Sequence, residues 1–238
     1  MTDAIMPSLS RQSGLMKELV VLAGNVANAG TEGYRREASV FTEYVDAGAA
    51  PGGVSMGALR GRYADRTQGA MVATGAPFDL AIEGDGMFAV QRGEEVLLTR
   101  AGRFQLDAEG TLVTASGHPV LDEGGGVIEV PPETAEVTVS PDGTISLDGL
   151  ASARIGVMDA APGTMERVGD TLWRAKDGAR YVDEPQVRQG FIERSNVDPV
   201  LEIARLTEVQ RAFEAGQNLL DTEHRRLERM IRLLGDNR

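Results

Sequence analysis

The C-terminal part of the chain carries the feature that most constrains its fold, a long helical repeat of apolar residues. Asn196-Val197-Asp198-Pro199 supplies a helix cap and an early helical proline. From there to Leu234 a heptad period holds without a slip, so two seams follow one helix. The first seam consists of Leu206, Phe213, Leu220, Leu227 and Leu234, and the second of Ile203, Gln210, Gln217, His224 and Ile231. Such a helix is roughly 50 Å long, which exceeds the width of a domain of this size.

The second seam contains three polar residues, Gln210, Gln217 and His224, where a two-stranded coil favours aliphatic side chains. If they are buried against other helices, they cost stability and fix the register or the number of partners. If they lie at the margin of a slightly rotated stripe, they meet water instead. The sequence leaves both interpretations open.

A second helical stripe occupies the N-terminus. Its members, at steps of four and three, are Ile5, Leu9, Gln12, Met16, Leu19, Ala23 and Val26. The stripe ends at Asn28-Ala29-Gly30-Thr31-Glu32-Gly33, which suits a helix C-terminus and a tight turn before Tyr34. Because each stripe needs a partner, we expect the two terminal helices to pair in a coiled-coil-like helical domain.

Between the helices the character of the sequence changes twice. Residues 42–74 are rich in Gly and Ala without a clear period, which indicates a linker or an extended arm. From Pro77 short apolar runs alternate with turn signals, which predicts a compact antiparallel β domain. The predicted strands lie at 78–82, 87–90, 96–98, 104–106, 112–113, 127–130, 137–139 and 145–147.

The predicted fold class is therefore α+β. The N- and C-terminal helices form a coiled-coil-like helical domain, and a compact antiparallel β domain is inserted between them. The predicted limits are 1–41 for the N-terminal helix and turn, 42–74 for the arm, 75–186 for the mostly β domain and 187–238 for the C-terminal helix.

Charge and composition exclude several kinds of function. The formal net charge of -12 disfavours nucleic acid and anionic lipid surfaces, which attract basic proteins. The chain contains no Cys, and so has no disulfide, thiolate metal site or Cys nucleophile. Its N-terminus does not resemble a Sec-type signal, and no apolar stretch approaches ~18 residues. We expect neither nucleic-acid binding nor direct membrane insertion.

Residues that could support catalysis or bind a metal are present but poorly placed. Asp79, Glu83 and Asp85 are close in sequence, yet Asp85 between two glycines suits a turn, and paired catalytic carboxylates need a defined separation. His118 and His224 are far apart and have no Cys beside them, so a metal site is not expected. We predict no catalytic, cofactor-binding or metal-binding residues, and a protein that is not an enzyme.

Three separated motifs resemble those of the axial proteins of the bacterial flagellum, the family of rod and hook subunits. The first extends from Asn25 to Arg36, with Glu32 where the family usually has proline. The second extends from Thr74 to Phe88 and is similar to the family's entry into its β domain. The third, from Val187 to Pro199, resembles the approach to the C-terminal helix. The motifs occur in the family's order, and the resemblance covers nearly the whole chain.

The resemblance implies a structural subunit of the basal-body rod. Length excludes the larger hook protein, and the central motif argues against the smallest rod subunits. Residues 117–146 and 151–175 are most similar to the proximal rod subunit, and the distal rod subunit is the alternative. A coiled-coil scaffold or adhesin and a rod-associated hydrolase are the remaining alternatives.

The resemblance also implies a location, partners and an interface. It implies export by the flagellar type III system, residence in the periplasmic rod, and no cofactor. The implied partners are copies of this chain, the other proximal and distal rod subunits, and the export apparatus. The expected assembly interface consists of Ile5, Leu9, Gln12, Met16, Leu19, Asn25, Val26, Asn28 and Tyr34 near the N-terminus, and of Ile203, Leu206, Gln210, Phe213, Gln217, Leu220, His224, Leu227, Ile231 and Leu234 near the C-terminus.

Overall fold

Two compact units make up the protein. The computed structural model describes residues 5–46, 54–161, 163–169 and 171–235. The first unit, called here the helix–hairpin unit, comprises Met1–Ala27, Glu37–Tyr63 and Asp198–Arg238. The second, called the β unit, comprises Asn28–Arg36 and Ala64–Val197. Both terminal segments of the chain therefore belong to one unit.

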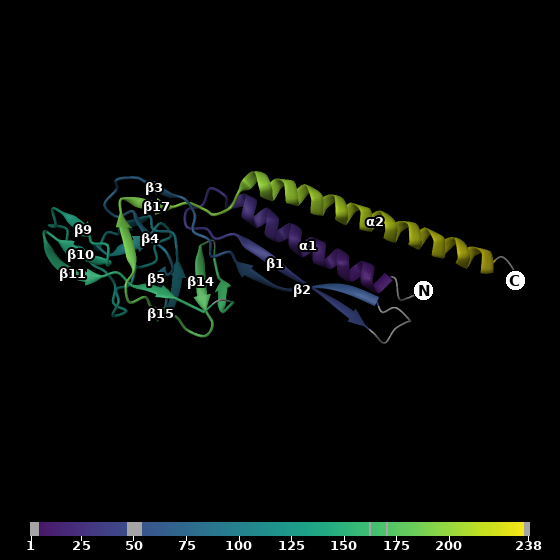
Figure 1. The fold of residues 1–238 in the computed structure, drawn as a ribbon, viewed down its shortest axis with the longest axis horizontal. Helices are drawn as coiled ribbons and strands as arrows, with labels where there is room; N and C mark the ends of the chain where they lie inside the picture. Colours follow the sequence, from purple (N-terminus) through teal and green to yellow (C-terminus); the bar gives the residue numbers. More distant parts are fainter. Residues whose placement is uncertain (1–4, 47–53, 162, 170, 236–238) are drawn as a thin grey trace. The chain divides into compact units, whose positions relative to one another are not determined.

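The helix–hairpin unit combines two helices with a β hairpin. α1 (Ile5–Ala27) and α2 (Pro199–Gly235) lie side by side (Figure 1). β1 (Glu37–Asp46) and β2 (Val54–Ala64) form a two-stranded sheet, and α1 also contacts β1. α2 begins as the sequence predicts, because Asp198 Oδ1 accepts hydrogen bonds from the backbone N–H groups of Val200 (3.0 Å) and Leu201 (3.1 Å).

The two helices run antiparallel. Near the start of α1, Gln12 Nε2 donates to Phe213 O in the middle of α2 (2.9 Å). Near the end of α1, Asn25 Nδ2 donates to Glu202 Oε2 in the first turns of α2 (3.0 Å). These two contacts place the start of α1 level with about residue 220 of α2. The last turns of α2 therefore extend past the start of α1, as Figure 1 shows.

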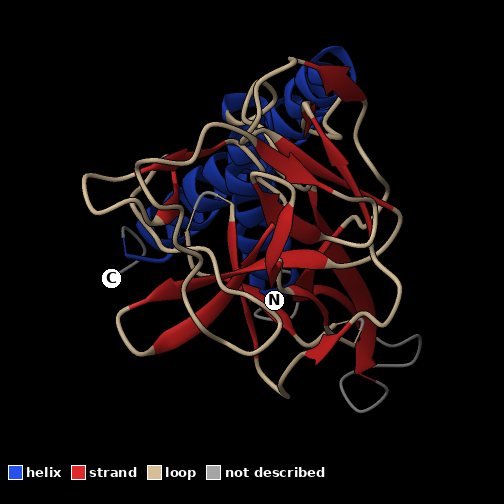
Figure 2. Cartoon of the chain, turned by 90° about the vertical axis from the view of Figure 1, so that its left-hand side faces the viewer, coloured by secondary structure: helices blue, strands red, loops and turns tan. Residues whose placement is uncertain are grey.

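The β unit contains many short strands in small antiparallel sheets, and Figure 2 shows how strands dominate the fold. One sheet has six strands in the order β13-β14-β6-β5-β12-β15, and another has the order β11-β10-β9. The pairs β16-β4, β17-β3 and β7-β8 form the remaining sheets. The strands are β3 (Met71–Ala73), β4 (Leu80–Glu83), β5 (Met87–Arg92), β6 (Glu95–Thr99), β7 (Phe104–Leu106), β8 (Leu112–Thr114), β9 (Val137–Val139), β10 (Thr144–Leu147), β11 (Leu150–Arg154), β12 (Val157–Asp159), β13 (Met165–Arg167), β14 (Leu172–Ala175), β15 (Arg180–Tyr181), β16 (Gln186–Gln189) and β17 (Phe191–Glu193).

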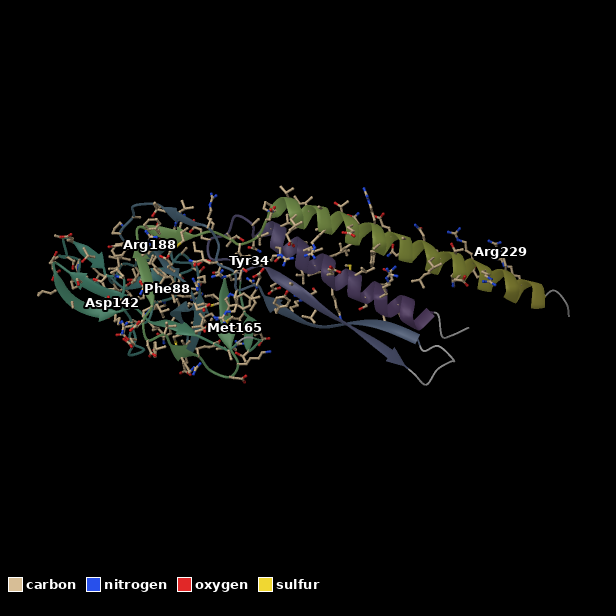
Figure 3. The ribbon with its side chains drawn as sticks, viewed as in Figure 1. Tyr34, Phe88, Asp142, Met165, Arg188 and Arg229 are labelled. Carbon is tan, nitrogen blue, oxygen red and sulfur yellow. The ribbon has the colours of Figure 1, made fainter. Side chains whose placement is uncertain are left out.

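One main hydrophobic core holds these sheets together. Its centre is Phe88 on β5, which is fully buried and packs edge-on against Phe104 of β7 with ring centroids 5.1 Å apart (Figure 3). Alternate residues of the predicted runs supply the rest, for example Leu80, Ile82 and Val90. The period-two pattern thus places the apolar side chains of several small sheets around one core.

The β unit is closed by strands from its two ends. β4 pairs with β16, with Leu80 opposite Gln189, and β3 pairs with β17, with Met71 opposite Glu193. The strand that leads into the unit and the strand that leads out of it are therefore hydrogen-bonded neighbours.

The structure corrects the predicted fold class. Among the described residues there are two helices, and the rest of the regular structure is strands in several sheets. A coiled-coil-like helical domain is not formed, because α1 is 23 residues long against 37 in α2 and packs against the β hairpin as well. Among the α2 side chains that the structure describes, the buried or half-buried ones are Glu202, Leu206, Val209, Ala212, Phe213, Gly216, Leu220 and Glu223. Glycine and two glutamates replace the large apolar residues that a heptad seam needs.

Residues 42–74, expected to be a linker or an extended arm, form most of the β1–β2 hairpin and then β3. The Gly- and Ala-rich run at 47–53 lies outside the described residues. The predicted strand at 127–130 contributes only isolated bridges, such as Leu121 with Val127. No helix in the described part of the chain is long and apolar enough to cross a membrane.

Candidate assembly surfaces

α1 has one apolar face that its own unit leaves open. Leu9, Met16 and Val20 are 58%, 53% and 52% exposed. Their spacing of seven and four residues places them on the same side of the helix. Leu9 and Met16 belong to the predicted stripe, whereas Val20 does not. Side chains of this size seldom stay exposed together without a function in binding.

Three other members of the N-terminal stripe, Gln12, Leu19 and Val26, are used inside the unit. Gln12 is buried and donates to Phe213 O, and Leu19 and Val26 are half-buried. A Cβ added at Gly216 would lie 2.2 Å from Gln12 Nε2, so the absence of a side chain there lets the amide reach α2. Beside this contact the helices form a groove of about 260 Å³, with Leu15, Ala212 and Leu219 among its lining residues.

Asn25 fixes the C-terminal end of α1 to both neighbours in the unit. Its side chain is fully buried. Nδ2 donates to Glu37 O (2.8 Å) and Glu202 Oε2 (3.0 Å), and Oδ1 accepts from Glu37 N (2.9 Å). The amide thus connects α1 to the first residue of β1 and to the start of α2.

The two predicted seams of α2 have different environments. Leu206, Phe213 and Leu220 of the first seam are half-buried, while Ile203, Gln210, Gln217 and His224 of the second are exposed. In the single chain the three polar residues of the second seam are exposed to solvent. The structure does not describe the side chains of four predicted interface residues, which are Ile5, Leu227, Ile231 and Leu234.

α2 also exposes large apolar residues that lie outside the first seam. Val200, Leu201, Ile203 and Leu219 are each more than half exposed. Apart from Ile203, the sequence reading missed them because it followed only the heptad positions. Their position off the pairing seam could have identified them. An apolar residue on that side of a paired helix must face solvent or another partner.

The turn after α1 belongs to the β unit. The backbone N–H and the hydroxyl of Thr31 each donate to Asn28, at 3.1 Å to its main-chain oxygen and 3.1 Å to Oδ1. Gly33 has a φ of 65°, and a Cβ there would lie 2.1 Å from Ala101 N. The positive φ and this close approach together require glycine at position 33.

Tyr34, predicted at the assembly interface, is a core residue of the β unit. It is 4% exposed, and the guanidinium carbon of Arg167 lies 4.2 Å from its ring centroid. The same guanidinium lies 4.2 Å from the ring of Trp173, which is also buried. Arg167 is therefore stacked between two aromatic rings and also donates to Arg35 O (2.6 Å).

A buried charge cluster, which the sequence did not reveal, lies beside this turn. Glu193 bridges Arg35 (2.9 Å) and Arg100 (3.0 Å), and all three side chains are at most 4% exposed. Gly69 N also donates to Glu193 Oε1 (2.9 Å). Burial lowers the pKa of Arg100 to about 10 and also lowers the pKa of Arg35, and the Glu193 carboxylate opposes both shifts. This cluster joins the segments that enter and leave the β unit.

The residues considered for catalysis are not brought together as a site. Asp79 lies 3.9 Å from Arg103, Glu83 lies 3.6 Å from Arg188, and Asp85 lies 3.5 Å from Arg66. Each carboxylate is thus paired with a different arginine. Within the described ranges no group of three or more His, Cys, Asp or Glu side chains could hold a metal ion.

Comparison with known proteins gives a consistent result along the chain. Residues 81–147 match the family described as flagellar hook protein FlgE/F/G D1 domain. Residues 188–233 match the family described as flagellar basal body rod FlgEFG protein C-terminal. The first match lies within the β unit, and the second includes β17 and most of α2.

Three relatives illustrate the similarity over the full chain. The chain is 40% identical to the flagellar basal-body rod protein FlgF of Caulobacter vibrioides, with 93% of each chain covered. It is 36% identical to FlgF of Mesorhizobium japonicum, with 99% of each covered. It is 29% identical to the flagellar basal-body rod protein FlgG of Bacillus subtilis, with 98% of this chain and 99% of the relative covered. The protein therefore belongs to the family of flagellar basal-body rod proteins, as an FlgF-like structural subunit of the proximal rod.

Proposed function

We propose that the helix–hairpin unit joins this chain to its neighbours in the rod, and that the contacts are made by the open faces of α1 and α2. The observation that carries the proposal is the exposure of Leu9, Met16 and Val20 on one side of α1. Val200, Leu201, Ile203 and Leu219 add a second exposed group on α2. Exposed apolar groups of this kind favour a protein partner.

The energetics set how much of each side chain must be covered. Taking a Leu, Ile, Val or Met side chain from full exposure to full burial contributes about 1.5–3 kcal/mol. Leu9, Met16 and Val20 are a little over half exposed, so covering the rest contributes roughly half of that. Ordering a side chain at an interface costs about 0.5–1.5 kcal/mol, so neighbours must cover several of these residues completely.

The predicted interface residues then divide into two roles. Leu9, Met16 and Ile203 would contact neighbours directly, together with the exposed polar residues Gln210, Gln217 and His224. The buried and half-buried residues would hold the two helices in the shape that presents those side chains; they are Gln12, Leu19, Asn25, Val26, Leu206, Phe213 and Leu220. We keep four further residues in the proposed interface: Ile5, Leu227, Ile231 and Leu234. Asn28 and Tyr34 would instead stabilise the β unit. The domain limits drawn from the sequence at residues 41, 74 and 186 remain a prediction.

The proposal includes a route and a location. Neighbours would be copies of this chain and other proximal and distal rod subunits, and the chain would reach the periplasmic part of the rod through the flagellar type III export apparatus. A chain without Cys supports this route, because no disulfide can form in an oxidising compartment and interfere with assembly. We further propose that the chain performs no catalysis, in keeping with a structural family.

The test replaces the open face of α1 while leaving the fold intact. A Leu9→Ser, Met16→Ser, Val20→Ser variant, expressed in place of the native chain, should be secreted normally but be absent from purified basal bodies, and the cells should not swim. The matched control is Leu150→Ser, because Leu150 is 76% exposed on the β unit. This control should assemble and swim like the parent. Normal basal bodies containing the triple variant would refute the proposal.

A further inference from the structure

The last turns of α2 carry a strong positive charge on a chain that is acidic as a whole. From Pro199 to Glu223 the helix has five acidic residues and two arginines, whereas from His224 to Gly235 it has four arginines and one glutamate. We call residues 224–235 the basic overhang, because this segment extends past the start of α1 (Figure 1). The charge therefore changes sign where α2 passes the first described residue of α1.

Three arginines of the overhang share a face. Arg225, Arg229 and Arg232 follow the i, i+4, i+7 spacing, and each is exposed. Figure 3 shows the Arg229 side chain on this part of α2. None of the three forms an ion pair with an acidic side chain in the part of the chain that the structure describes. By contrast, Arg226 pairs with Glu223 (3.6 Å) within the helix.

The helix dipole explains only part of this arrangement. Cations stabilise the last turn of a helix, and Arg232 lies there. The effect falls off within one turn, however, and Arg225 lies ten residues before the end of α2. Three unpaired cations on one exposed face thus favour an acidic partner.

The earlier part of α2 offers a matching surface. Glu214 and Asp221 are exposed and lie seven residues apart, and the same separation joins Arg225 to Arg232. If α2 helices of two copies lie parallel with a stagger of eleven residues, Arg225 comes level with Glu214 and Arg232 with Asp221. Eleven residues correspond to about 16 Å along the helix axis. A single shift therefore aligns both pairs of opposite charge.

We propose that the basic overhang of one copy docks on the acidic part of α2 in a second copy of this chain, with the two helices parallel and staggered. This inference rests on the proposed assembly through the helix–hairpin unit and specifies one of its contacts. The contact pairs different segments of the two copies, and it is therefore heterologous.

The exchange of charges provides the first test. Arg225→Glu with Arg232→Glu places like charges level with one another and should reduce the amount of this chain in purified basal bodies at least tenfold. Adding Glu214→Arg and Asp221→Arg to the same chain restores opposite charges and should restore incorporation. Arg211→Glu, which changes an exposed arginine before the overhang, is the matched control and should leave incorporation unchanged. Circular dichroism of each secreted variant verifies that α2 is retained.

Cysteine pairs provide the second test, because the native chain contains no Cys. The Glu214→Cys, Arg225→Cys variant should form disulfide-linked dimers in oxidised basal bodies, since these positions are too distant within one helix to pair. Two further variants detect an antiparallel, symmetric contact instead. They are the double variant Asp221→Cys, Arg225→Cys and the single variant Glu223→Cys. Neither should form disulfides between copies. Crosslinking in those variants, or basal bodies that assemble without the predicted disulfide-linked dimer, would overturn the staggered contact while leaving the proposed rod assembly intact. Absence of the native chain from basal bodies would instead refute the rod assembly itself.

Discussion

The side chain of Asn25 pairs with the main chain of Glu37 as a neighbouring strand would. Nδ2 donates to Glu37 O at 2.8 Å and Oδ1 accepts from Glu37 N at 2.9 Å, so both backbone groups of the first β1 residue are satisfied by one amide. The same Nδ2 reaches the buried Glu202 carboxylate of α2. One side chain therefore sets the positions of a helix end, a strand start and a second helix.

We predict that Asn25→Ala destabilises the helix–hairpin unit by about 2–4 kcal/mol, because it leaves buried polar groups without partners. Hydrogen exchange at the Glu37 amide should become faster. Asn25→Asp should cost more, since a carboxylate cannot donate to Glu202 and adds a like charge beside it. Asn218→Ala on the exposed side of α2 serves as the control and should change stability by less than about 0.5 kcal/mol. Unchanged exchange at Glu37 in Asn25→Ala would contradict this role.

We predict that Glu193→Gln destabilises the β unit by about 3–5 kcal/mol. The substitution removes the charge that compensates Arg35 and Arg100 in the core, and breaking a buried pair on one side costs this much. The chain has one Trp, and Trp173 is buried in the β unit, so its fluorescence during urea unfolding reports on this unit.

The matched control for Glu193 is Glu166→Gln. Glu166 lies 3.8 Å from Arg174 and 3.6 Å from Lys176, but at the surface, where such pairs contribute at most about 1 kcal/mol. Equal effects of the two substitutions would mean that burial of the Glu193 cluster has no energetic consequence.

We predict an energetic coupling between Gly216 and Gln12. Gly216→Ala should gain up to about 1 kcal/mol of helix propensity, but its Cβ would displace the Gln12 amide from Phe213 O. In a Gln12→Ala background nothing is displaced, so the same substitution should be more favourable there by about 1 kcal/mol. Thermal unfolding of the four proteins of the cycle measures this coupling. Additive effects would show that the two positions are independent.

We predict that Glu18→Gln stabilises the helix–hairpin unit at neutral pH but not in acid. Burial raises the pKa of Glu18 above 4.5, with Arg205 opposing the shift. The folded state therefore holds a proton more tightly than the unfolded state does, and stability falls as pH rises from 4.5 through the raised pKa. Gln cannot ionise and avoids this loss. The difference in free energy of unfolding between variant and parent should thus grow over that pH range and stay constant above it; a constant difference below it as well would exclude the explanation.

The sequence predicted the two helices and many of the β strands, because each depends on local signals. Asp198 and Pro199 begin α2 where the cap and proline predict, and period-two apolar runs became β4, β5 and β6. The fold class nevertheless went wrong. A helix that exposes and buries apolar residues at similar spacings does not reveal which face meets its partner. Gly216 lets the Gln12 side chain of α1 reach α2, but a glycine does not count as an apolar position in a helical pattern.

The buried contacts could not be predicted for a different reason. Arg35, Arg36, Arg100 and Arg103 are equivalent in a sequence, and only the folded β unit shows that Arg35 and Arg100 share Glu193. The separation of Arg100 and Glu193 in the chain exceeds the range of any local pattern. Likewise, the β1–β2 hairpin was concealed by the Gly and Ala residues of its sequence, which lower β propensity although the segment pairs.

The closing strands of the β unit determine when folding can finish. β3 pairs with β17, β4 pairs with β16, and α1 packs against α2. Each of these partners comes late in the chain, so neither unit is complete without the segment from Gln186 onward. Contacts between such distant segments form late, because closing a long loop costs entropy before it yields any contact. A chain that emerges with its N-terminus first would therefore keep its helices and its closing strands unpaired until the last of these segments is available. The protein acquires its stable form only when the whole chain can fold together.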